Sequence, residues 1–171
     1  MYLGVDLGTS SVKLVLADGE GRIADSASAK YPLLLPEDGW SEQNPEDWYA
    51  GVIACVRELG CRHDLSAVKG VSFSGQMHGL VVLDKDDNVI RPAILWNDNR
   101  TTEECAYLND VVGKDKLLEW TGNVAFTGFT APKLMWMKRH EPENFARIAK
   151  IMLPKDYVAY KMSGVFGSDV S

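Results

Sequence analysis

The segment Gly4-Val5-Asp6-Leu7-Gly8-Thr9-Ser10 places an acidic residue near the end of an apolar run, directly before a tight Gly-Thr-Ser turn. The flanking residues 2–7 and 12–17 are rich in apolar and β-branched side chains, which predicts two strands joined by this turn. A β-hairpin therefore opens the chain, in place of the β-α-β crossover of a Rossmann domain.

The same segment is the strongest candidate for a phosphate site. A carboxylate at Asp6 is costly to bury unless a partner compensates it. A Mg²⁺ ion, reached directly or through water, would be such a partner, and Gly8, Thr9 and Ser10 offer backbone N–H groups and hydroxyls to a phosphate. Lys13 is suited to neutralising phosphate charge. The alternatives are that Asp6 only caps the turn and that Lys13 is a solvated strand residue.

A third strand and a helix follow this hairpin. A second turn at 18–21 leads into an alternating run over 22–30, which completes an antiparallel meander of three strands. Asn44 is predicted to cap a helix that ends at Gly60. The buried stripe of that helix is expected to contain Trp48, Val52, Val56 and Leu59.

The rest of the chain adds strands and then mainly helices. We expect a strand at 69–74 and a hairpin between 80–83 and 89–96. From Arg100 onward the pattern is helical, with three proline-marked helix starts at Pro132, Pro142 and Pro154. This order of elements predicts a mixed α/β domain. The motif Gly19-x-Gly21 imitates a dinucleotide fingerprint, but no helix follows it, so we interpret these residues as hairpin glycines.

Composition and charge exclude several classes of protein. The 171 residues are 46% hydrophobic, which is enough to build a core without metals or disulfides. The net charge of −6 and the lack of a basic run disfavour nucleic acid as a partner. Three cysteines without a C-x-x-C pair disfavour a disulfide framework or a zinc ribbon. Without a signal-like start or a membrane-length apolar run, we expect a cytoplasmic protein with no membrane partner.

A second loop bounded by glycines, Gly75-Gln76-Met77-His78-Gly79, follows the strand predicted at 69–74. Glycines at both ends allow a ligand to approach the backbone closely. His78 offers a ring nitrogen to a ligand hydroxyl, and Met77 offers a flexible apolar surface to a carbon face. Gln76 and the rest of the loop supply backbone groups. The alternative is a histidine with a structural role.

Three further residues are candidates for the same ligand. Trp96, Asp98 and Arg100 are expected to line or brace the same cleft, because an aspartate can accept two ligand hydroxyls and Arg100 can hold Asp98 in place. A core tryptophan beside a surface ion pair is the competing interpretation.

Several motifs in a fixed order give the chain a family resemblance. Besides the phosphate turn and the loop Gly75–Gly79, they are Trp40-Ser41-Glu42-Gln43, Pro92-Ala93-Ile94-Leu95-Trp96-Asn97-Asp98-x-Arg100, Thr121-Gly122-Asn123, Thr130-Ala131-Pro132-Lys133-Leu134 and Leu153-Pro154-Lys155-Asp156-Tyr157. With them the chain resembles the front part of the FGGY carbohydrate kinases over residues 4–171. That family belongs to the actin-like ATPases with a ribonuclease H-like fold. The resemblance therefore implies an α/β domain whose mixed sheet starts with an antiparallel meander and is followed by helices.

The resemblance also implies an activity. The Gln-Met-His-Gly form of the loop is similar to that of the family's xylulokinases, whereas glycerol-kinase-like members carry an Arg-Glu pair at the positions of Met77 and His78. It implies in-line transfer of the γ-phosphoryl group of ATP to D-xylulose, giving D-xylulose 5-phosphate. Asp6 would hold Mg²⁺ through water, and Gly8–Ser10 would face the transferred phosphate.

The resemblance further implies that residues 1–171 form only the N-terminal sugar- and phosphate-binding domain. The family's catalytic base and its C-terminal nucleotide-binding domain are then expected outside this chain, which would be inactive by itself. The partners implied are a small sugar and ATP, and a homodimer of the full-length enzyme is compatible with the resemblance.

Three other functions are weighed against this one. The first is a kinase of the same family for another sugar or polyol. The second is a nucleotide-driven actin-like module without a sugar, which would have no need of the loop Gln76–Gly79. The third is a glycosidase with paired carboxylates, for which Asp6 and Asp98 are only scattered candidates and the phosphate turn has no purpose.

Overall fold

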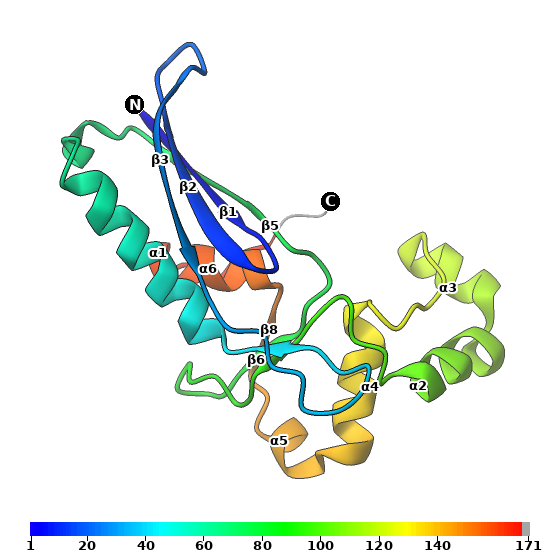
Figure 1. Ribbon diagram of the computed structural model, residues 1–171. Coiled ribbons are helices and arrows are strands. Elements are labelled where there is room, and N and C mark those ends of the chain that lie inside the picture. The colour runs from blue at the N-terminus through cyan, green and yellow to red at the C-terminus, as the bar shows by residue number, and fades with distance from the viewer. Residues whose placement is uncertain (169–171) are drawn as a thin grey trace. The chain divides into compact units, whose positions relative to one another are not determined.

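The computed structural model describes residues 1–168, and the chain divides into two compact units. Unit 1 combines residues 1–33 and 44–77 with the segment from 154 onward, and unit 2 combines 34–43 with 78–153. Figure 1 shows the elements of both units in chain order. Residues 169–171 lie outside the described part.

Unit 1 is built on a mixed sheet with the strand order β3-β2-β1-β5. The strands are β1 (Tyr2–Leu7), β2 (Ser11–Ala17), β3 (Ile23–Lys30) and β5 (Val71–Gly75). The pairs β1–β2 and β2–β3 are antiparallel, whereas β5 runs parallel to β1. The predicted meander and the mixed α/β class are therefore confirmed. Gly21, with φ of 80°, lies in the turn between β2 and β3, as expected of a hairpin glycine.

Two helices bury one face of this sheet (Figure 1). Helix α1 (Pro45–Gly60) packs against β2 and β3, and helix α6 (Pro154–Ser163) packs against β1 and β5. Asn44 caps α1 as predicted, since its side chain accepts a hydrogen bond from the Glu46 N–H at 3.2 Å. The strands contribute alternate residues to this core: Leu3, Val5, Leu7, Val12, Leu14 and Leu16.

Contacts between the two helices complete the core of unit 1. The ring of Trp48 in α1 is fully buried and packs edge-on against Tyr157 of α6, with the ring centroids 6.4 Å apart. Gly51 lets α1 approach the sheet, because a Cβ atom there would lie 3.0 Å from Cγ1 of Val12. A short 3₁₀ helix, η1 (Leu65–Ala67), leads into β5.

Unit 2 contains two short antiparallel strand pairs. Strand β4 (Glu42–Gln43) pairs with β7 (Ala93–Ile94), and β6 (Val81–Leu83) pairs with β8 (Lys150–Met152). The helical elements are α2 (Thr102–Ala106), the π-helix η2 (Tyr107–Gly113), α3 (Lys114–Thr121), α4 (Thr130–His140) and α5 (Pro142–Ala146). A core cluster joins β6, β7 and α4 through Leu80, Val82, Ile94, Trp136 and Met137.

Unit 2 departs from the sequence prediction in two places. The predicted hairpin is present, since Leu83 pairs with Val89 and Leu80 with Ile94, but residues 89–96 do not form one continuous strand, and β7 also pairs with β4. The segment expected to be helical after Arg100 also contains β8, which pairs with β6. A strand of three residues that is stabilised by pairing with a distant strand is too short to show a periodic pattern in the sequence. Helix α4 begins at Thr130, which places Pro132 in its first turn, and α5 and α6 begin at the predicted prolines.

A search of residues 1–168 for a helix that is both long and apolar enough to cross a bilayer finds none.

Candidate functional site

The phosphate turn and the start of the second loop leave unit 1 at the same edge of the sheet. Leu7 and Gly75 are register partners at the carboxyl ends of the parallel strands β1 and β5. The Gln76 N–H then donates to the Leu7 carbonyl at 2.7 Å. In open α/β sheets ligands bind beyond the carboxyl ends of the strands, so this edge is where a ligand site is expected.

Asp6 lies on the open face of the sheet and is exposed, which corrects the expectation of a buried carboxylate. The pleat explains the difference: Val5 and Leu7 point into the core, so the residue between them points away from it. Its register partners are Lys13 on β2 and Ser74 on β5. The structure therefore brings two of the predicted phosphate-site residues, Asp6 and Lys13, side by side on one face.

A buried tyrosine fixes the turn between β1 and β2. The Gly8 N–H donates to the Ser11 carbonyl at 3.0 Å, which closes the turn, while Ser10 stays exposed. The Tyr31 hydroxyl donates to the carbonyl of Gly8. Burial, together with the negative charge of Asp6, raises the pKa of Tyr31, which keeps its hydroxyl a donor. No pattern in the sequence joined Tyr31 to this turn, because the two are brought together only by the pairing of β2 and β3.

Asp6 is a single carboxylate, which resembles the magnesium sites of nucleotide enzymes more than a metal site built from several protein ligands. Among residues 1–168, no group of three or more His, Cys, Asp or Glu side chains could hold a metal ion. Mg²⁺ in nucleotide enzymes is usually bound by one or two carboxylates and by substrate phosphates, with water filling the remaining positions. One exposed aspartate at a strand end satisfies that description.

The second loop spans the boundary between the two units. Gln76 is buried and Met77 is 56% exposed in unit 1, whereas His78 belongs to unit 2. His78 adopts a φ of 62°, in the left-handed region that non-glycine residues rarely occupy. Its ring packs against Phe129, with the centroids 4.5 Å apart. Burial and the positive charge of Lys133 lower the pKa of His78, which favours the neutral ring with one donor and one acceptor nitrogen.

A cavity of about 280 Å³ borders the His78 ring in unit 2. It is lined mainly by apolar side chains from η2, α3, the loop between α3 and α4 and the start of α4: Leu108, Leu117, Val124, Ala125, Phe129, Ala131 and Pro132, with Thr121, Asn123 and Thr130 as polar members. Asn109 of η2 holds its wall by exchanging two hydrogen bonds with the backbone of Ala125, at 2.9 and 3.0 Å. The predicted motif Thr121-Gly122-Asn123 thus forms part of this wall.

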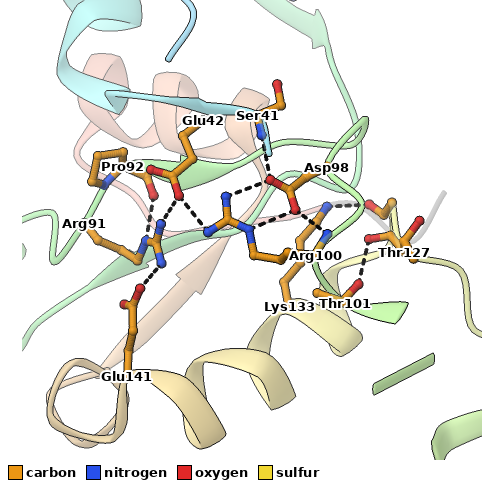
Figure 2. A network of polar contacts seen from close by, with 11 residues as sticks. Ser41, Glu42, Arg91, Pro92, Asp98, Arg100, Thr101, Thr127, Lys133 and Glu141 are labelled. Carbon is orange, nitrogen blue, oxygen red and sulfur yellow. Dashed lines mark hydrogen bonds and ion pairs between the residues drawn. The ribbon is translucent and has the colours of Figure 1, made fainter. Parts of the chain in front are cut away.

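Asp98 and Arg100 form a buried ion pair in unit 2 (Figure 2). The Asp98 side chain is 0% exposed and the Arg100 side chain 1%. Arg100 donates to Asp98 through Nε at 2.9 Å, through Nη2 at 2.7 Å and through its backbone N–H at 3.0 Å. The Ser41 N–H adds a fourth bond at 2.7 Å. Arg100 therefore braces Asp98 as the sequence suggested, and both oxygens of the carboxylate already bind protein groups.

The ion pair continues into a larger network (Figure 2). Glu42 forms an ion pair with Nη1 of Arg100 at 2.7 Å and also pairs with Arg91, which in turn pairs with Glu141. The Arg100 guanidinium lies over the ring of Trp40, 3.7 Å from its centroid, and 4.9 Å from that of Trp136. The predicted motif Trp40-Ser41-Glu42-Gln43 thus contributes a ring, a backbone donor and a carboxylate to one network.

Trp96 is 48% exposed at the surface of the same unit. Gly128 lies against it so closely that a Cβ atom there would clash with the Trp96 carbonyl. The structure brings His78, Trp96, Asp98 and Arg100 together in unit 2, while Asp6, Gly8, Thr9, Ser10, Lys13, Gln76 and Met77 lie in unit 1. The peptide bond between Met77 and His78 links the two groups covalently.

Comparison with known proteins shows that this chain is similar to the N-terminal part of carbohydrate kinases. A sequence profile described as the FGGY family of carbohydrate kinases, N-terminal domain, matches residues 1–171. A xylulose kinase of Escherichia coli (strain K12) is 46% identical over 171 residues, which are 100% of this chain and 35% of that protein. The chain therefore spans about a third of the length of the curated relatives it matches.

Solved structures give the same result. The crystal structure of xylulose kinase from Rhodospirillum rubrum matches with a TM-score of 0.93 and 30% identity, over 98% of this chain and 35% of that one. The crystal structure of gluconate kinase from Lactobacillus acidophilus matches with a TM-score of 0.89 and 27% identity, over 96% of this chain and 33% of that one.

Proposed function

Since the chain belongs to the FGGY family of carbohydrate kinases, with their actin-like ATPase fold, we propose that its full-length protein transfers phosphate from ATP to D-xylulose. The product would be D-xylulose 5-phosphate. The observation that carries the proposal is the parallel pair β1–β5, from whose carboxyl ends the Gly-Thr-Ser turn and the Gln-Met-His-Gly loop both start. A phosphate donor and a sugar acceptor bound to these two segments would meet at one sheet edge.

The β1–β2 turn is proposed to handle the nucleotide phosphates. Gly8, Thr9 and Ser10 would face the transferred phosphate, and Lys13 would offset its negative charge. Asp6 would hold Mg²⁺ through water, and the ion would neutralise charge on the phosphate oxygens when it is bound. The exposure of Asp6 and its place beside Lys13 support these roles.

The second loop is proposed to bind the sugar. His78, as a neutral imidazole, can donate to one hydroxyl and accept from another, and Met77 presents an exposed apolar surface. Gln76 would contribute backbone groups, and Trp96 would offer its half-exposed ring to the sugar's carbon face. Asp98 and Arg100 are proposed to support the sugar site from within, because burial and mutual pairing leave them little access to a ligand.

The remaining machinery is proposed to lie outside this chain. The relatives are about three times as long as residues 1–171, which leaves room for a C-terminal nucleotide-binding domain and for the catalytic base. The isolated chain would then bind sugar weakly and turn over negligibly. We also propose a cytoplasmic location, a sugar and ATP as the only partners needed for the reaction, and a homodimer as the full-length assembly.

A kinase for a related acid or polyol is the second candidate. The match to a gluconate kinase from Lactobacillus acidophilus favours it, because a shared fold in this family accommodates more than one acceptor. The 46% identity to a xylulose kinase, against 27% to the gluconate kinase, supports D-xylulose first.

The test is an acceptor panel with the full-length protein. ATP-dependent phosphorylation would be followed with D-xylulose, D-ribulose, D-gluconate and glycerol at equal concentrations. The proposal expects the highest kcat/KM for D-xylulose and negligible turnover by residues 1–171 alone. A higher kcat/KM for gluconate or glycerol would support the second candidate, and appreciable turnover by the short chain would refute the assignment of the base to a missing domain.

A further inference from the structure

A completely buried lysine lies directly behind the proposed sugar loop. Lys133, in the first turns of α4, is 0% exposed. Its ammonium nitrogen donates to the carbonyl oxygen of His78 at 2.8 Å and also to the carbonyl of Gly128. Both acceptors are backbone carbonyls at the proposed site. One belongs to His78 itself, and the other belongs to Gly128, which lies against Trp96.

A second side chain of the same helix binds the same carbonyl. The Thr130 hydroxyl donates to the His78 oxygen at 3.2 Å. Thr130 and Lys133 are three residues apart, so they share one face of α4, and that face is turned toward His78. The helix therefore holds a single peptide group of the loop with two donors.

The backbone of His78 adopts a conformation that has to be stabilised by its surroundings. His78 has a φ of 62°, a conformation that is unfavourable for a non-glycine residue unless its surroundings impose it. Phe129 contacts the His78 ring but does not bind its backbone. The hydrogen bonds from Thr130 and Lys133 are the described contacts that constrain the carbonyl, and with it the direction in which the ring projects.

Packing alone gives no reason for an amine at position 133. Burying an ammonium carries a large desolvation cost, and an unbranched apolar side chain would fill similar space without it. Burial lowers the pKa of Lys133 to about 7, with Asp98 opposing the shift and Arg100 adding to it. The N–H donors of this side chain match the two backbone carbonyls of His78 and Gly128.

We propose that Lys133 is a positioning residue for the sugar: it fixes the backbone of His78 in the left-handed conformation and so aims the imidazole at the substrate. Thr130 assists it at the same carbonyl. The inference rests on the proposed sugar-binding role of His78, and it assigns a function to a lysine that need not contact substrate or nucleotide.

The test uses the full-length protein with the variants Lys133→Met and Lys138→Met. Lys138 lies on the same helix but is exposed, so it is the matched control. We expect Lys133→Met to raise KM for D-xylulose about tenfold or more, because a tenfold change corresponds to the loss of at least one well-placed hydrogen bond. KM for ATP should change less than about twofold. Lys138→Met should behave as wild type. Unchanged KM for the sugar, or equal increases for sugar and ATP, would overturn the proposal.

A double-mutant cycle separates positioning from general destabilisation. If Lys133 acts through His78, adding Lys133→Met to His78→Ala should change KM for D-xylulose by less than about twofold. If the fold-changes in KM of the two single variants multiply in the double variant, the lysine acts independently of His78, and the proposal is overturned. If Lys133→Met does not fold, Thr130→Val replaces it in the same cycle, with the same expectation and a smaller single effect.

A wrong substrate assignment can be distinguished from a wrong role for Lys133. If the wild-type protein prefers another acceptor, the same cycle is run with that acceptor, and non-additivity still supports positioning by Lys133. If the wild-type protein phosphorylates none, a crystal structure of full-length Lys133→Met reports the φ of His78 directly. A φ still near 62° in that variant would overturn the proposal whatever the enzyme's substrate.

Discussion

Leu7 and Gly75 face each other at the ends of the parallel strands β1 and β5, and a Cβ atom on Gly75 would lie 2.7 Å from both the Cβ atom and the carbonyl oxygen of Leu7. No side chain fits at that distance without displacing one of the two strands. Because Gly75 has no side chain, the start of the proposed sugar loop can lie close to the proposed phosphate turn.

Gly75→Ala should separate the two strand ends. Overpacking of this kind costs about 1–3 kcal/mol, and the displaced backbone should lower kcat/KM for the sugar as well. Denaturant unfolding and steady-state kinetics of the full-length protein measure both effects. Gly19→Ala is the control, because a Cβ atom there has no neighbour within 4 Å. Wild-type stability and activity in Gly75→Ala would show that the close approach is dispensable.

Asp6→Asn should impair turnover far more than sugar binding. The substitution keeps the shape of the side chain and removes the charge proposed to hold Mg²⁺, which matters chiefly in the transition state. We expect kcat to fall about 100-fold or more, while the Kd for D-xylulose, measured calorimetrically without nucleotide, changes less than about threefold. Asp86→Asn, at an exposed hairpin position, controls for loss of a surface carboxylate. Equal losses in turnover and sugar affinity would contradict the role given to Asp6.

Arg100→Met should destabilise the protein strongly. It leaves the carboxylates of Asp98 and Glu42 in a buried setting without their shared partner. Removing one member of a buried ion pair typically costs about 3–5 kcal/mol. Arg22→Met is the matched control, because the Arg22 side chain is 73% exposed and its ion pairs are solvated. Equal denaturation midpoints for the two variants would indicate that the network in Figure 2 contributes little to stability.

The pH dependence of stability should change when Lys133 is replaced. The pKa of Lys133 is lowered from 10.5 to about 7 in the folded protein, so between those values unfolding takes up a proton. The free energy of unfolding of wild type, relative to Lys133→Met, should therefore rise as pH increases from about 7 toward 10, by up to about 1.4 kcal/mol per pH unit. Below pH 7 the lysine is charged in both states and the difference should level off.

The groups facing Lys133 set the sign of this prediction. Asp98 and Cys105 favour its charged form, whereas burial and Arg100 favour the neutral one, and burial dominates. Urea midpoints of the two proteins between pH 6 and pH 9.5 measure the difference. A relative stability that stays constant over this range would mean that Lys133 is held as a cation.

Local signals in the sequence were sufficient for much of unit 1. Alternating apolar residues predicted the meander, and Asn44 with Pro45 marked the start of α1. Motif order pointed to the family, and the loop glycines pointed to the strand ends. These features depend on neighbours within a few residues of each other, which a sequence displays directly.

The parts that the sequence did not predict depend on distant contacts. Strand β8 exists because β6 pairs with it, and Tyr31 reaches Gly8 only through the meander. The burial of Lys133 could not be anticipated, because a lysine on a helix is most often solvated. The exposure of Asp6 is an exception: its apolar neighbours suggested burial, although the alternation of its own strand places it on the open face.

The most direct test of the central claim is a crystal structure of the full-length protein with D-xylulose and a non-hydrolysable ATP analogue. The account predicts the terminal phosphate against Gly8–Ser10, with the sugar contacting Met77 and His78 and its acceptor hydroxyl near that phosphate. Both ligands bound away from the carboxyl ends of β1 and β5 would contradict it.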